Sequence, residues 1–148
     1  MLDIVVMAFF LAFMAVNAFF ALTSGDGRLR SVAILFWSIW FVTHYFPYTE
    51  IIVSPISFVI LSRLQIRKRG EVQLARWMVP VIAAEAGLFL SHIAYFAVDY
   101  ITYWILVQAF FIIQLTASTA AGFRKSLVKW RDHEGSASQH TAAKFAPY

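Results

Sequence analysis

The chain has 148 residues, of which 61% are hydrophobic and 14% are charged, and its mean hydropathy is +0.71. Soluble domains are about 45–50% apolar and about 25% charged, so this composition excludes an ordinary water-soluble globule and predicts an all-α integral membrane protein. The absence of cysteine excludes disulfides, thiolate metal sites and thiol nucleophiles. The net charge of +4 does not indicate a nucleic-acid partner, because all Lys and Arg lie in three patches, at 28–30, 63–76 and 124–144, a pattern typical of membrane topology.

The first apolar block covers residues 4–22, close to the 20 or so residues that a membrane-spanning helix needs. It has neither the basic leading segment nor the small-residue cleavage site of a secretory signal, so we expect it to be a retained first span. The Thr-, Ser- and Gly-containing run 23–27 then predicts a turn.

Two short apolar blocks follow, at 31–46 and 51–64, with Pro47 between them and Pro55 inside the second. As a single helix, residues 31–64 would be about 51 Å long with two internal prolines. We therefore expect a short, Pro-interrupted helical hairpin. A re-entrant pair and a four-span protein, in which this region crosses once, are the alternatives.

Residues 77–122 are almost continuously apolar, and a straight helix of that length would measure about 69 Å, over twice the hydrocarbon core of about 30 Å. Near the middle lies Asp99, surrounded by Tyr and Trp residues of the kind that favour a membrane interface. The sequence thus predicts a tight turn between spans 77–97 and 101–122. Residues 132–148 show no clear period, and we expect a loosely ordered cytoplasmic tail there.

Charge placement favours five spans. In that arrangement the N-terminus, the 44–50 segment and the turn at Asp99 share one side, which carries acidic residues but no Lys or Arg. Every basic residue falls on the other side. The positive-inside rule then predicts a bacterial inner-membrane protein with its N-terminus outside and its C-terminus in the cytoplasm.

Glu85 is the clearest candidate for chemistry, because it lies near the middle of a predicted span and ionisable groups there are costly. It could carry a proton or a cation, or it could be hydrogen-bonded and hold helices or subunits together. His92 lies two helical turns further on, on the same face of the helix.

His44 and His92 are predicted on different helices in the outer half of the membrane. Ligation of haem b needs a cross-helix pair of this kind, and quinone sites also use His beside aromatic residues. The alternative is that His44 is an interface residue and His92 forms a hydrogen bond inside the bundle. The tail histidines, His133 and His140, have no partner at a metal-ligand spacing.

Polar and small residues predict contacts between helices. Uncharged polar side chains in the first and last spans are expected to hydrogen-bond across helices, among them Asn17, Gln108, Gln114, Ser118 and Thr119. Small residues at helical spacing are expected to let backbones approach, and these are Ala8, Ala12, Ala15, Ala83, Gly87, Ala117 and Ala121. The Phe-rich remainder of the first span, including Phe10, is expected to face lipid or a partner.

The basic residues are expected to set the topology and to attract anionic lipid headgroups. Those singled out are Arg63, Arg67, Lys68, Arg69, Arg124 and Lys125. No phosphate-binding glycine loop, nucleophile elbow or zinc-helix motif occurs in the sequence.

No motif in the sequence identifies a particular reaction. The first functional hypothesis is a non-enzymatic accessory or structural subunit of a membrane complex, with the lipid bilayer and other membrane subunits or a second copy as partners and no nucleic acid. A small proton- or ion-coupled transporter or channel using Glu85, and a redox subunit holding haem b or quinone through His44 and His92, are alternatives. A phage holin is a further one.

Overall fold

The computed structural model describes residues 2–46, 49–66, 75–95 and 97–144, and it describes side chains within 4–46, 49–64, 75–95 and 97–132. All regular structure in these ranges is helical, as predicted. The five helices are α1 (Leu2–Thr23), α2 (Gly27–Tyr45), α3 (Glu50–Ile66), α4 (Met78–Ala94) and α5 (Tyr100–Lys144). Two of them, α1 and α5, contain stretches long and apolar enough to cross a membrane, and α4 is apolar but shorter.

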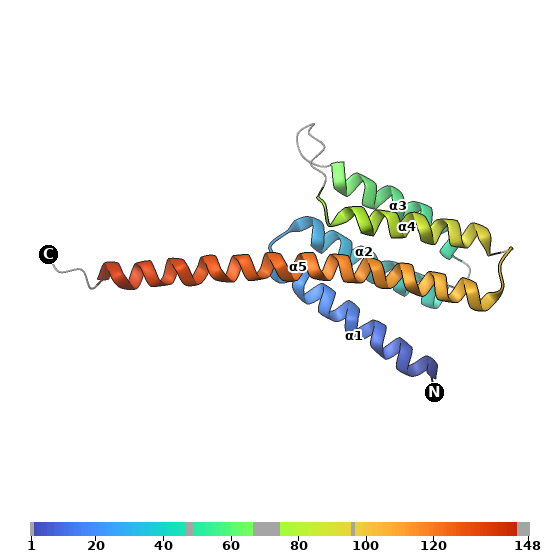
Figure 1. Cartoon of the computed structure of the whole chain (residues 1–148), viewed down its shortest axis with the longest axis horizontal. Coiled ribbons are helices and arrows are strands. Elements are labelled where there is room, and N and C mark those ends of the chain that lie inside the picture. The colour runs from blue at the N-terminus through green and yellow to red at the C-terminus, as the bar shows by residue number, and fades with distance from the viewer. Residues whose placement is uncertain (1, 47–48, 67–74, 96, 145–148) are drawn as a thin grey trace.

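Successive helices run in opposite directions, so their ends gather at two opposite poles of the bundle (Figure 1). The N-terminus, the end of α2 and the α4–α5 turn lie toward one pole. The α1–α2 turn, the end of α3 and the start of α4 lie toward the other, where α5 leaves the bundle. The helices therefore form an antiparallel bundle in chain order.

The α1–α2 turn explains why the chain reverses after Thr23. Gly25 has a φ of +73°, a left-handed conformation that glycine adopts without steric cost. Asp26 then caps α2, since its Oδ1 accepts a hydrogen bond from the Arg28 backbone N–H at 2.8 Å. Both residues belong to the run in which the sequence predicts a turn.

Pro55 lies inside α3, as the bounds of the predicted block 51–64 require, and does not interrupt it. Only one backbone N–H is lost there, and the helix continues to Ile66. The last helix does not stop near Gly122 but continues to Lys144, projecting beyond the bundle (Figure 1). Helix α5 therefore includes most of the segment that was expected to be loosely ordered. No proline interrupts the helix before Lys144.

The core lies where all five helices meet. Its buried side chains come from every helix and comprise Phe10, Met14, Val32, Phe36, Leu61, Val81 and Leu115. The prediction that Phe10 faces outward is wrong, since it is 8% exposed and belongs to this core. A smaller cluster of Ala21, Leu29 and Ala33 packs beneath the α1–α2 turn.

Candidate functional site: a buried carboxyl that joins three helices

Glu85 lies in the middle of α4 and is 2% exposed. Its Oε1 accepts hydrogen bonds from the hydroxyl groups of Ser57 and Ser54 on α3, the latter at 3.3 Å. Its Oε2 accepts a bond of 2.5 Å from Nε2 of Gln114 on α5. One carboxyl group thus connects α4 to the helices on both sides of it.

Two of the three donors around Glu85 also contact backbone carbonyl oxygens. The Ser57 hydroxyl lies 2.8 Å from the Ser54 carbonyl oxygen, and Nε2 of Gln114 lies 3.4 Å from the carbonyl oxygen of Val81. Ser54 and Ser57 are three residues apart, so both hydroxyls lie on one face of α3. The carboxyl oxygens are therefore satisfied by donors of the same chain, as buried polar groups require.

A second polar contact joins α1 to α5. Nδ2 of Asn17 donates to the Ser118 hydroxyl at 2.6 Å and lies 3.0 Å from the Thr119 hydroxyl. Asn17 and Ser118 are both buried. The prediction that uncharged polar residues bond across helices is confirmed for Asn17, Gln114, Ser118 and Thr119.

His92 belongs to a third network, near the α4–α5 turn. The Tyr103 hydroxyl donates to Oε2 of Glu50 at 2.9 Å, and Nδ1 of His92 lies 2.9 Å from the same hydroxyl oxygen. Because the single phenolic proton is used toward Glu50, the His92 Nδ1 must be the protonated nitrogen in this arrangement. Glu85 and His92 are both buried on α4, on the shared face that the spacing predicts.

His44 has different surroundings. Its ring is exposed and stacks on Trp40, with centroids 5.0 Å apart and an interplanar angle of 11°. No hydrogen bond or ring contact joins it to His92 within the described ranges, so the structure does not bring this predicted pair together. The same part of the chain holds no group of three or more His, Asp or Glu residues suited to a metal ion.

The small residues fall into two groups. Gly87 faces the Phe110 ring of α5 so closely that an added Cβ would lie 2.4 Å from it, while Ala117 and Ala121 pack against the two apolar clusters. The others are exposed, and these are Ala8, Ala12, Ala15 and Ala83. The three alanines of α1 lie opposite its buried positions, so their predicted role concerns a surface that this chain leaves open.

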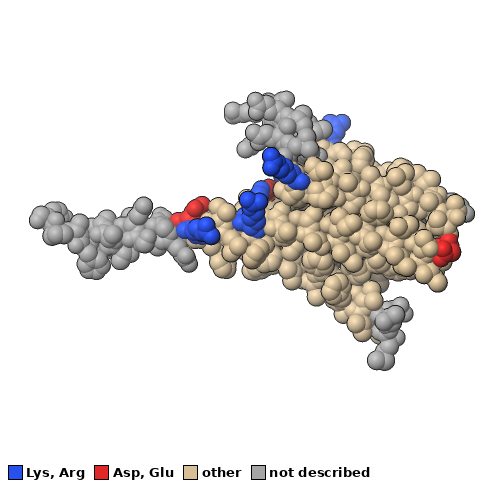
Figure 2. Space-filling model, in the orientation of Figure 1, with Lys and Arg blue, Asp and Glu red and all other residues tan. Residues whose placement is uncertain are grey.

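Charge is separated along the bundle. Lys and Arg gather at the pole where α5 leaves the bundle, together with Asp26 and Asp132, whereas the opposite pole shows acidic residues without Lys or Arg in this view (Figure 2). Arg63 and Arg124 are exposed there, and Lys125 forms an ion pair with Asp26. Burial raises the pKa of Asp26, but the bonds from Lys125 and from the Arg28 N–H outweigh it, so this pKa lies below its ordinary value of 3.8.

Three of the basic residues singled out from the sequence, Arg67, Lys68 and Arg69, lie outside the described residues.

At the opposite pole, Oδ1 of Asp99 accepts a hydrogen bond from the Thr102 backbone N–H at 2.9 Å, and Oδ2 of Asp99 accepts one from the Thr102 hydroxyl at 2.6 Å. The side-chain bond and then the backbone bond from Thr102 lower the pKa of Asp99.

Sequence reasoning missed four members of these networks. The signal for Ser54 and Ser57 was their three-residue spacing within an otherwise apolar block, which places two hydroxyls on one helical face. Glu50 and Tyr103 carried no such signal, since both resembled ordinary residues of a membrane interface.

Comparison with known proteins adds no relative. No protein-family model matches the chain, and neither the curated proteins nor the solved structures include a match to it.

Proposed function

We propose that the chain is a small multi-pass membrane protein that acts as a non-enzymatic accessory subunit, assembling with a second copy or with another membrane protein. The single observation that supports this most is the Glu85 network. Its carboxyl oxygens are occupied by donors from α3 and α5, which suits a group that fixes helix packing. Interhelical hydrogen bonds of this kind contribute about 0.6–2 kcal/mol each.

The outer surface supports a location in lipid. In the apolar stretch of α1 only 22% of the residues are buried, whereas the core helix of a soluble protein is mostly buried. Its exposed side chains include Ile4 at 66% and Phe9 at 58%. Soluble monomers rarely expose contiguous apolar surface beyond a few hundred Å². With the basic pole in the cytoplasm, the N-terminus lies outside the inner membrane of a bacterium.

The exposed face of α1 supports assembly. Ala8, Ala12 and Ala15 lie within one sector of the helix, and small residues there let a second helix approach closely. The part of α5 that projects beyond the bundle offers a second surface, outside the apolar region (Figure 1). A subunit of this shape can bind one partner in the membrane and another at its surface.

The assembly surface can be tested with one substitution on α1 and a matched control on α5. Ala12→Phe fills the small-residue face, whereas Ala109→Phe adds the same side chain at another exposed position. We expect Ala12→Phe to reduce the mass of the detergent-solubilised complex, measured by light scattering, and Ala109→Phe to leave it unchanged. A wild-type protein that is monomeric and co-purifies with nothing would refute the proposal.

A carrier role for Glu85 is the second candidate. The observation that favours it is a carboxyl group buried in an apolar bundle beside two hydroxyls and an amide. In liposomes containing a pH-sensitive dye, the carrier role predicts proton uptake that Glu85→Gln abolishes. Uptake that is absent, or is unaltered by Glu85→Gln, excludes it.

A further inference from the structure

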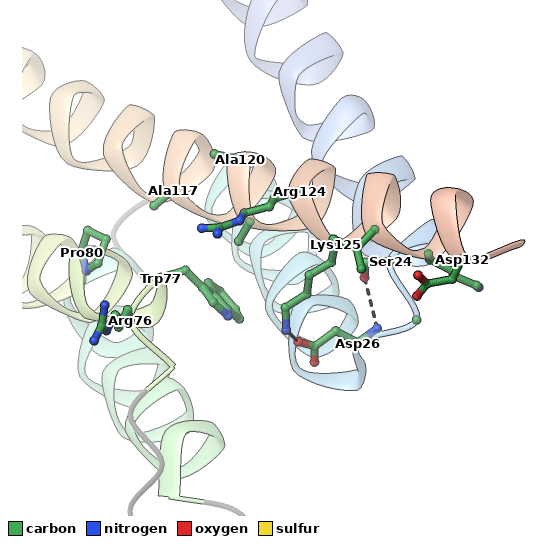
Figure 3. Close-up of a pocket in the computed structure, with 14 residues that line it drawn as sticks. Ser24, Asp26, Arg76, Trp77, Pro80, Ala117, Ala120, Arg124, Lys125 and Asp132 are labelled. Atoms are coloured by element: carbon green, nitrogen blue, oxygen red, sulfur yellow. Dashed lines mark hydrogen bonds and ion pairs between the residues drawn. The ribbon is translucent and has the colours of Figure 1, made fainter. Parts of the chain in front are cut away.

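A cavity of about 820 Å³ opens at the basic pole, between the α1–α2 turn, the start of α4 and the middle of α5 (Figure 3). Its polar side carries Arg76, Arg124, Lys125 and Lys129 against Asp26 and Asp132. Four basic and two acidic residues leave two positive charges at the site. The volume falls in the range of about 300–1,000 Å³ typical of small-molecule sites.

The cations of the cavity are not all neutralised within the chain. Lys125 is paired with Asp26. Arg76, Arg124 and Lys129 are exposed, and none has an ion-pair partner among the residues that the structure describes. Figure 3 shows Arg124 pointing from α5 toward the start of α4, where Arg76 lies. Two guanidinium groups line the same cavity, one from α5 and one from the segment before α4, and guanidinium groups suit a phosphate oxygen acceptor.

Trp77 supplies a further donor. Its indole Nε1 is the one buried side-chain nitrogen or oxygen without a hydrogen-bond partner in the described part of the chain. Trp77 lines the cavity at the start of α4. Buried indole N–H groups usually find an acceptor, and Trp side chains are enriched where an apolar region meets a polar one.

The other wall of the cavity is apolar. Pro80 of α4 and Val128 of α5 line it, together with the small residues Ala117, Ala120 and Ala121. The small side chains leave a smooth strip along α5 that leads from the basic residues toward the apolar part of the bundle. A free phosphate ion would use the cations but leave this strip uncovered.

We propose that this cavity binds an anionic phospholipid, with its phosphate between Arg76 and Arg124 and the first part of an acyl chain along the alanines of α5. The inference rests on the proposed membrane location. Charge complementarity selects an anionic headgroup, and the apolar wall selects a phosphate that carries a hydrocarbon chain. The site lies at the pole where a headgroup would be, since the basic residues mark the edge of the bundle.

Native mass spectrometry of the full chain in mild detergent tests this proposal. The protein is titrated with phosphatidylglycerol, with phosphatidylcholine and with inorganic phosphate. We expect phosphatidylglycerol to bind and phosphatidylcholine to bind at least tenfold more weakly. Competition by millimolar inorganic phosphate would show a site for the free ion and would overturn the assignment of a lipid.

Two charge variants separate the cavity from the general charge of the pole. Each basic residue near an anionic headgroup contributes a factor of about five to binding, so Arg76→Gln with Arg124→Gln should weaken phosphatidylglycerol binding by about 30-fold. Arg63→Gln with Arg131→Gln removes equal charge from exposed residues that do not line the cavity. Equal losses in the two double variants would overturn the proposal.

A steric variant keeps the test decisive if the arginine variant fails to fold. Ala120→Trp fills the apolar strip and should abolish binding, whereas Ala109→Trp, elsewhere on α5, should not. Ala12→Phe, the assembly variant, should bind lipid normally. A wild-type protein that does not assemble but binds lipid selectively therefore counts against the accessory-subunit proposal alone, and a wild-type protein that assembles without lipid selectivity counts against this inference alone.

Discussion

Replacing Glu85 by Leu removes the acceptor that joins α3 and α5 to α4. Three side-chain hydrogen bonds are lost, from Ser54, Ser57 and Gln114. Ser57 and Gln114 keep their contacts to backbone carbonyl oxygens, so each of these two losses should be near the average for membrane proteins, about 0.6 kcal/mol, and the longer Ser54 bond should contribute about as much. The free energy of unfolding should thus fall by about 2 kcal/mol, and by more where a donor loses its second partner as well.

Glu85→Gln provides the matched control. The amide oxygen still accepts from both serines, and the bond to Gln114 is recovered if that amide turns over. We expect a loss of at most about 0.6 kcal/mol, the average for one interhelical bond. Gln108→Leu, at a half-buried position of α5, should change stability less than Glu85→Leu.

The assay is reversible unfolding in mixed micelles of mild and denaturing detergent, followed by far-ultraviolet circular dichroism. The structural role of Glu85 predicts the order wild type, Glu85→Gln, Glu85→Leu from most to least stable. If Glu85→Leu unfolds at the same detergent fraction as wild type, or if Glu85→Gln is destabilised as much as Glu85→Leu, the reasoning fails.

Two further predictions concern the α1–α5 crossing and the α1–α2 turn. A Cβ at Gly122 would lie 3.0 Å from the Cβ of Phe20 and 3.1 Å from its carbonyl carbon, so Gly122→Ala must separate the two helices and should cost about 1–3 kcal/mol in thermal unfolding. Gly27→Ala, where an added Cβ meets nothing within 4 Å, should not destabilise the protein. Because the folded-state pKa of Asp26 is lowered, its contribution to stability is present above the unfolded value and is lost as pH falls through the folded value. A pH titration of stability from about pH 5 to about pH 2 should therefore lose a component of at most about 1 kcal/mol that is missing in Asp26→Asn, and identical curves would contradict the role of the Lys125 ion pair.

The sequence was sufficient for the helices and for the arrangement of their ends. The lengths of the apolar blocks predicted five helices, the run that holds Gly25 and Asp26 predicted the first turn, and Lys and Arg lie toward one pole as expected. These features depend on local sequence and on total composition along each block, so no knowledge of neighbouring helices was needed.

The rotation of each helix about its own axis, which decides the face that turns toward the core, could not be predicted from the sequence. In α1 nearly every position is apolar, so no contrast between faces indicates that Phe10 and Met14 turn inward while Ala12 turns outward. The hydrogen-bond partners of Glu85 could not be predicted for the same reason. Ser57 reaches the carboxyl group only in one rotation of α3 about its own axis, and the sequence does not specify that rotation. The length of α5 was missed for a different reason: hydropathy marks where an apolar stretch ends, whereas a helix ends where its backbone is interrupted.

The central claim is that the bundle spans a membrane with its basic pole in the cytoplasm. Since the chain has no native cysteine, single cysteines report cleanly on each pole. Asp99→Cys should react with a membrane-impermeant maleimide in intact spheroplasts, and Gly27→Cys should react only after the membrane is opened. Equal labelling of both before opening, the reverse order, or protein left in the supernatant after ultracentrifugation would contradict the claim.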